Sequence, residues 1–190
     1  MSLQEKLKTK HKNKLLKMQK SIWIFGTLAG ALSAFLEYLY FSSSNFSPMT
    51  LFIAKMAVLI ICVVFGLVLI RKLLGGSISV ARTLLSGSLI SLTRAIVMIG
   101  VFLFLYYPSG EFYQPKIQEA LQIAENKVMA DENIKDADKE EEIRITQADI
   151  TPQFKPLGYS GIAIASSLIT GLIISVLVAA FISTNMMYKE

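Results

Sequence analysis

Apolar residues gather in four long runs, and the segments between these runs hold most of the polar and charged positions. The runs cover residues 22–41, 51–70, 84–107 and 159–183, so each is 20 to 25 residues long. A helix needs ~20 apolar residues to cross the hydrocarbon core of a bilayer. The pattern therefore predicts four membrane-spanning helices, and an all-α integral membrane bundle as the fold class.

The segment 108–158, between the third and fourth runs, has a different pattern. Apolar residues recur at helical spacing from Ile117 to Val128, and charges surround them, which predicts a solvated helix over 111–142. Two prolines in 143–157 predict an extended return to the membrane. This extramembrane helix is expected to lie on the rim of the bundle, or to act as a lid over a binding site.

Composition agrees with a membrane protein of one bundle domain. The chain of 190 residues is 53% hydrophobic and only 17% charged, and its mean hydropathy is positive. These values lie outside the ordinary range of soluble domains. Residues 1–20 form a basic tail and residues 184–190 a short second tail.

Charge differs from segment to segment in a way that predicts orientation. Residues 1–20 hold seven Lys and one Glu, and the connection 71–83 holds three basic residues. The connection 42–50 has no charge, whereas 108–158 holds six basic and eleven acidic residues. Positive residues near helix ends stay in the cytoplasm. We therefore expect both termini to be cytoplasmic and the acidic loop 108–158 to be outside.

Small residues recur every four positions along three of the predicted helices. Such faces let membrane helices approach closely, because lipid gives helices little hydrophobic reason to associate. They predict packing inside the bundle or, as the alternative, a docking face for a homo-oligomer or a larger membrane complex. The candidate packing residues are Gly26, Gly30, Gly87, Ser167, Gly171 and Ser175.

Ionisable residues are rare within the runs. Glu37 and Lys55 each lie four residues from the end of a run, at the same predicted depth, so they are placed to pair across the first two helices. A structural ion pair, two side chains that reach toward the surface, and a proton- or ion-responsive site are all compatible with this placement.

Arg94 lies deeper, roughly 15 Å into the third run at 1.5 Å per residue. Ser91 gives its helix a partly polar stripe, so we expect Arg94 to face the bundle and to donate to hydroxyls or carbonyls, or to reach toward Glu37. Its role is structural, or it serves an anionic ligand, a lipid headgroup or a transported ion. The candidate polar site is Arg94, Glu37, Lys55 and Ser91.

Motifs for catalysis are missing from the sequence. The only histidine is His11, in the basic tail, and the only cysteine is Cys62, so a His-dependent nucleophile and a His-ligated metal site both lack a necessary residue. The chain has no phosphate-binding G-x-x-x-x-G-K-[ST] motif. We expect neither an enzyme nor a bound cofactor or metal.

The Lys-rich tail is expected to contact anionic lipid headgroups, at ~1 kcal/mol for each charge near the surface. Nucleic-acid binding is the competing interpretation of a lysine tract. It is not expected here, because residues 1–20 contain no aromatic residue for base stacking and are tethered to a span.

The run from Phe65 to Leu92 resembles the central signature of a bacterial family of four-helix membrane proteins of unknown function, numbered 4199 among the domains of unknown function. The resemblance extends over residues 22–183, with Val80 where an aromatic residue is expected and with a longer basic tail. It implies the same topology, in a bacterial inner membrane, and no catalytic residue or substrate. Its motifs are Arg71-Lys72, Gly75-Gly76, Ser77–Ser79, Gly87–Ser91, the acidic segment 111–150, and Gly171–Ser175.

Two functions follow as expectations. The first is an accessory or interaction subunit that assembles through its transmembrane helices, and that packs against itself or a partner through the fourth helix and the outer acidic helix. The alternative is a small oligomeric transporter or channel with Arg94 and Glu37 in a polar path.

Overall fold

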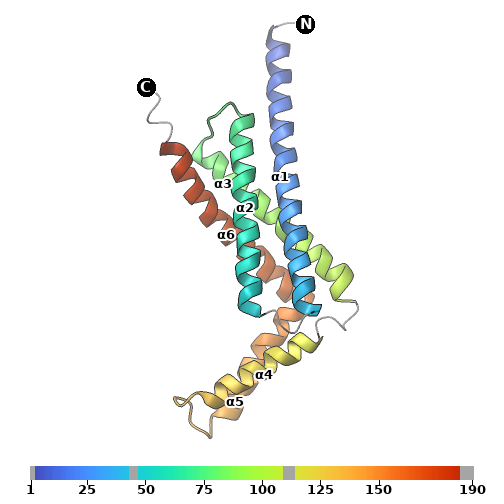
Figure 1. Ribbon diagram of the computed structural model, residues 1–190, viewed down its shortest axis with the longest axis vertical. Coiled ribbons are helices and arrows are strands. Elements are labelled where there is room, and N and C mark those ends of the chain that lie inside the picture. Colours follow the sequence, from blue (N-terminus) through green and yellow to red (C-terminus); the bar gives the residue numbers. More distant parts are fainter. Residues whose placement is uncertain (1–2, 43–46, 109–113, 185–190) are drawn as a thin grey trace.

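The computed structural model describes residues 3–42, 47–108 and 114–184, and every regular element in these ranges is helical. Four α-helices form a bundle and two shorter ones lie at one end of it (Figure 1). The elements are α1 Leu3–Ser42, α2 Pro48–Leu73, α3 Val80–Val101, the π-helix η1 Phe102–Tyr106, α4 Gln114–Ala130, α5 Lys139–Ile150, the 3₁₀-helix η2 Thr151–Phe154, and α6 Pro156–Thr184.

Four stretches are long and apolar enough to cross a membrane: Lys12–Ser42, Pro48–Leu73, Val80–Tyr106 and Pro156–Phe181. The most apolar windows in them have mean hydropathies between 1.5 and 2.9. Large apolar side chains cover the outside of the bundle, as lipid contact requires. The predicted all-α fold with four helices of membrane-spanning length is confirmed.

Polar residues and glycines mark the boundaries of the helices in the connections between the apolar runs. Ser47 caps α2, its Oγ accepting the backbone N–H of Thr50 at 3.1 Å. Gly75 and Gly76, between α2 and α3, have φ values of 96° and 95°, which favour glycine. Arg71 closes this turn, its Nε donating to the carbonyl of Gly76 at 2.7 Å.

The bundle has two distinct ends. Figure 1 shows α4 and α5 together below one end, while α1 begins and α6 finishes at the opposite end. We call these the hairpin end and the terminal end. α3 packs mainly against α1 and α6, and α2 packs mainly against α1. The interface between α2 and α6 is therefore smaller than these three.

Aliphatic side chains fill the terminal half of the bundle. Leu59, Val63 and Leu67 on α2 are completely buried, and Ile90 from α3 and Ile174 from α6 belong to the same cluster. α1 continues beyond this core, past the α2–α3 connection (Figure 1). The described lysines of the predicted basic tail therefore belong to a continuous 40-residue helix.

The segment 111–142 is not one helix, so that prediction is wrong. In the described part, α4 ends at Ala130 and α5 starts at Lys139. Asp131 Oδ1 accepts the backbone N–H of Asn133 at 2.9 Å, a local bond that competes with helix continuation. Residues 109–113, which include the predicted start of the helix, lie outside the described residues.

The extended return predicted over 143–157 is also wrong. α5 continues to Ile150, and η2 occupies Thr151–Phe154. Only Lys155 is extended, directly before Pro156, the first residue of α6. The two prolines therefore begin helices, a position at which the missing N–H has no cost.

Candidate functional site

Glycines of α1 lie where that helix crosses α3. A Cβ atom on Gly26 would lie 2.9 Å from the carbonyl oxygen of Ile90, and one on Gly30 would lie 2.5 Å from the Cβ of Val97. Both distances are too short for any side chain. The small face predicted on the first helix is therefore occupied by another helix of the same chain.

The crossing of α3 and α6 is built from small residues on both sides. Gly87 lies against the hydroxyl of Ser175, and Gly171 lies against Ser91. Ser175 turns its Oγ back to the carbonyl of Gly171, at 2.6 Å. Gly171 and Ser175 of α6 thus face α3 and are not available to a partner.

Arg94 lies near the middle of the third span and joins three helices. Its Nε donates to Ser33 Oγ on α1 at 3.0 Å, and its Nη1 donates to Ser167 Oγ on α6 at 2.7 Å. Both serines are completely buried, and Arg94 is 6% exposed. A guanidinium carries five N–H donors, so these two bonds leave donors unused. No acidic side chain bonds Arg94 among the described residues.

Glu37 forms the centre of a second polar group, one turn of α1 nearer the hairpin end than Ser33. It is buried and forms an ion pair with Lys55 of α2, as expected from their matching depth. The Tyr159 hydroxyl, at the start of α6, donates to Glu37 Oε2 at 2.7 Å. The carboxylate therefore has a cationic and a neutral partner, which offset the cost of its burial.

Aromatic rings hold Tyr159 in place. Its ring stacks on Phe102 of η1, with centroids 3.9 Å apart and planes at 10°. Nearby, the Tyr106 hydroxyl donates to the carbonyl of Ala34 at 2.9 Å, which ties η1 to α1. The π-helix thus supplies two aromatic side chains to the polar region, a common place for such a turn.

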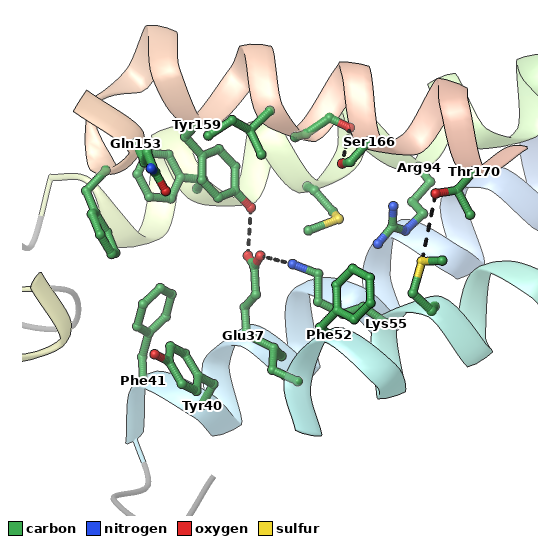
Figure 2. A pocket seen from close by; sticks show the side chains of 17 residues that line it. Glu37, Tyr40, Phe41, Phe52, Lys55, Arg94, Gln153, Tyr159, Ser166 and Thr170 are labelled. Atoms are coloured by element: carbon green, nitrogen blue, oxygen red, sulfur yellow. Dashed lines mark hydrogen bonds and ion pairs between the residues drawn. The ribbon is translucent and has the colours of Figure 1, made fainter. Parts of the chain in front are cut away.

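A cavity of about 410 Å³ lies between α1, α2, α3 and α6, and we call it the hairpin-end cavity. Its volume falls within the ~300–1,000 Å³ typical of small-molecule sites. Figure 2 shows Glu37, Lys55, Tyr159 and Arg94 around it. The other lining residues are Tyr40, Phe41, Leu51, Phe52, Met56, Met98, Phe102, Gln153, Phe154, Ile162, Ala163, Ser166 and Thr170.

The charged residues of this cavity are one carboxylate and two cations. Lys55 is bonded to Glu37, whereas Arg94 is bonded only to neutral hydroxyls. Figure 2 shows the Arg94 guanidinium directed toward the same space as Lys55. The excess positive charge and the unused donors give the cavity the chemistry to hold an anion.

Three of the four predicted polar residues meet at this cavity: Arg94, Glu37 and Lys55. Ser91 does not line it, because its side chain lies at the α3–α6 crossing. Ser91 Oγ is the one buried side-chain oxygen or nitrogen without a hydrogen-bond partner in the described part of the chain. Ser91 therefore belongs to the face of α3 that packs against α6.

Sequence reasoning missed Ser33 and the role of Tyr159. Ser33 lies four residues before Glu37 and so shares its helix face, a signal that was present in the sequence. Tyr159 is separated from Glu37 by 122 residues, and a single sequence carries no signal of that contact. In the described ranges no group of three His, Cys, Asp or Glu residues could hold a metal ion.

Residues 24–184 match a family model described as "Protein of unknown function (DUF4199)". No curated protein and no solved structure matches the chain.

Proposed function

The chain belongs to the DUF4199 family of proteins of unknown function, and we propose that it binds an anionic ligand in the hairpin-end cavity. The protein would be a binding or carrier component of a membrane, without catalytic activity of its own. The proposal follows from the second function expected from the sequence, the transporter or channel with Arg94 and Glu37 in a polar path, and limits it to the binding of an anion.

The observation that carries the proposal is the bonding of Arg94. A charged side chain near the bilayer centre costs ~2.5–3.5 kcal/mol on insertion scales, and two serine hydroxyls return only part of that cost. Glu37 is already engaged with Lys55 and Tyr159. An anion in the cavity would neutralise Arg94 and use its remaining donors.

The interior next to Arg94 favours binding over open conduction. Toward the terminal end, Leu59, Val63 and Ile90 are completely buried at the centre of the bundle. These aliphatic side chains do not line the cavity but fill the interior of the bundle beyond it, toward the terminal end. A ligand can therefore enter from the hairpin half, while a continuous polar path through the bundle lacks support.

The accessory role expected from the sequence has less support. The sequence predicts that this role uses the fourth helix and the outer acidic helix, but Gly171 and Ser175 of the fourth helix face α3 of the same chain. Assembly with a partner would have to use other surfaces, such as α4 and α5.

For location, we propose a bacterial inner membrane with both chain ends in the cytoplasm. The start of α1 and the end of α6 lie at the same end of the bundle (Figure 1). The described basic residues of 1–20 and 71–83 belong to that end, and the described part of the acidic segment 108–158 belongs to the other. Anionic headgroups at the membrane surface would then meet the lysines nearest the bundle.

The test is native mass spectrometry of the full chain in detergent with three twelve-carbon probes: dodecyl phosphate, dodecanoate and dodecyltrimethylammonium. We expect an adduct with at least one anionic probe and none with the cation. Arg94→Gln should weaken that adduct about tenfold or more, since a hydrogen bond to a charged group contributes ~1.5–3 kcal/mol. Arg94→Lys, which keeps the charge, should restore part of it.

The matched control is Arg82→Gln, an exposed arginine on the same helix, which should bind like the wild type. Circular dichroism and thermal unfolding identify variants that fold. Adducts that are equal in wild type and folded Arg94→Gln, or equal for anionic and cationic probes, would contradict the proposal.

A further inference from the structure

A second hollow lies next to the cavity, on the terminal half of the bundle. It is a groove of about 410 Å³ between α2 and α6, and only apolar side chains line it. We call it the α2–α6 groove, and its residues are Ile60, Val64, Val68, Ile174, Leu177, Val178 and Phe181.

The groove continues the line of the cavity. Met56 and Thr170 line the cavity, and Ile60 and Ile174, each four residues further along the same helices, line the groove. Four residues are about one helical turn, or ~6 Å. Met56 and Thr170 also contact each other across this side of the cavity, through a weak bond from Thr170 Oγ1 to Met56 Sδ at 3.8 Å. Methionine is flexible and readily repacked.

One row of side chains on each helix forms the walls of the groove. On α2 it is formed by Ile60, Val64 and Val68, which recur every four residues and so make a single straight row. On α6 the opposite wall runs from Ile174 to Phe181, seven residues further along, or ~10 Å at 1.5 Å per residue. This length is about a third of the ~30 Å hydrocarbon core.

We propose that the ligand is an anionic amphiphile with a single alkyl chain, its head beside Arg94 and Lys55 and its chain in the α2–α6 groove. This inference rests on the proposed function, because it takes the anion site of the cavity as given. It adds the class of ligand. A charged head and an apolar tail match two adjoining hollows, one charged and one wholly apolar.

The depth of the two hollows explains why a protein would be needed. Arg94 lies near the middle of the span Val80–Tyr106, where an unprotected anionic head would be costly. The cavity surrounds the head with partners, while the groove lets the chain extend toward the terminal end as it would in lipid. A phosphate and a carboxylate share this chemistry, and the probes above distinguish them.

The test locates the chain with a photoreactive dodecyl phosphate that carries a diazirine near its end. In the full-length protein in lipid nanodiscs, we expect cross-links within Ile60–Val68 and Ile174–Phe181. Arg94→Gln should reduce them about tenfold, and Arg82→Gln should leave them unchanged.

Leu177→Trp would fill the groove without touching the head site. Its matched control is Val176→Trp, because these neighbours are 57% and 54% exposed and only Leu177 lines the groove. We expect Leu177→Trp to reduce the groove cross-links about tenfold, and Val176→Trp to leave them unchanged. Butyl phosphate has a chain too short to occupy the groove. Its binding should therefore be equal in the wild type, Leu177→Trp and Val176→Trp.

The outcomes separate the two proposals. Cross-links spread evenly over the lipid-facing surface and independent of Arg94 would overturn both, and so would the absence of any adduct. Arg94-dependent binding with cross-links outside the groove, or with no response to Leu177→Trp, would leave the anion site and overturn the amphiphile. Stronger competition by two-chain phosphatidic acid than by dodecyl phosphate would overturn the single chain.

Discussion

The two halves of the bundle use the same four helices in opposite ways. In the terminal half, Leu59, Val63, Leu67 and Ile70 of α2 are completely buried in an aliphatic cluster. In the hairpin half, the same helix presents Lys55 to a cavity of about 410 Å³ that also holds Glu37 and Arg94. The buried centre of the terminal half is a filled aliphatic cluster with an apolar groove beside it, whereas the hairpin half holds a charged cavity.

The difference indicates where stability and binding reside. Close packing stabilises a membrane bundle through van der Waals contacts, so the terminal half can hold the helices together without a buried ion pair. Buried charges need polar partners, and the hairpin half provides them around its cavity. A bundle anchored at one end can keep a cavity at the other, and four experiments test this division.

The largest effect is expected from a substitution at a helix crossing. Gly87→Leu would force α3 away from Ser175 of α6, where even a Cβ atom has no room. We expect a loss of about 3 kcal/mol or more in the free energy of unfolding, the upper part of the range for overpacking. The measurement is unfolding in mixed detergent micelles, together with the yield of folded protein.

Gly100→Leu is the matched control, because a Cβ at Gly100 of the same helix meets nothing within 4 Å. It should unfold like the wild type or be slightly more stable, since glycine is a poor helix former. Equal losses in the two variants would contradict the close crossing.

The next effect compares the halves directly. Leu67→Ala should cost about 3 kcal/mol, because it opens a new cavity in a filled core. Met98→Ala should cost about 1 kcal/mol. Although Met98 is only 3% exposed, it lines an existing cavity, so its removal enlarges a space that is already there. The same unfolding assay gives both values, and equal losses would mean that the halves are packed alike.

A smaller loss is expected from the ion pair. Glu37→Gln keeps the hydrogen bond to Tyr159 but leaves Lys55 without a counter-charge. Breaking a fully buried pair costs about 3–5 kcal/mol, and the Lys55 side chain keeps 21% exposure, so we expect about 2 kcal/mol. The double variant Glu37→Gln/Lys55→Gln should lose less than the two single losses combined, and strict additivity would argue against coupling.

The smallest effect concerns an exposed pair outside the bundle, on α5. Arg144 donates to Glu141 at 2.6 and 2.9 Å, and this hydrogen bond lowers the pKa of the Glu141 carboxyl. A depressed folded pKa means that the pair stabilises α5 above the unfolded pKa, and that this contribution disappears as the pH falls through the folded pKa.

Arg144→Gln should raise the pKa of Glu141 toward the ordinary ~4.3, as measured by NMR titration of the labelled carboxyl. The unfolding free energy near neutral pH should hardly change, because exposed pairs contribute little. A loss comparable to that of Glu37→Gln would remove the contrast between buried and exposed charges.

The sequence predicted the spans well because a bilayer imposes one length on every helix that crosses it. It also predicted that Glu37 and Lys55 lie at one depth, because both positions are counted from the ends of apolar runs. The α4–α5 segment was mispredicted. No bilayer constrains its length, and the helix break there depends on a local side-chain bond of Asp131.

From the sequence, only those contacts of the site could be predicted that follow from the depth of each residue in the membrane, such as the pair of Glu37 and Lys55. Depth cannot say which helix faces which, so the approach of Tyr159 to Glu37 and of Ser167 to Arg94 could not be derived. The hollows between helices depend on crossing angles and side-chain packing, and a single sequence does not encode these in any local pattern.

The bonding of Arg94 also determines when the bundle can be completed during synthesis. Ser33 precedes Arg94 in the chain, but Ser167 follows it by 73 residues. At ~5–20 residues per second, the ribosome needs about 4 to 15 s to add them. During that interval the arginine has left the ribosome with only one of its two serine partners. A chain that stops before α6 would carry this half-bonded charge permanently, a mark by which membrane quality control could recognise it.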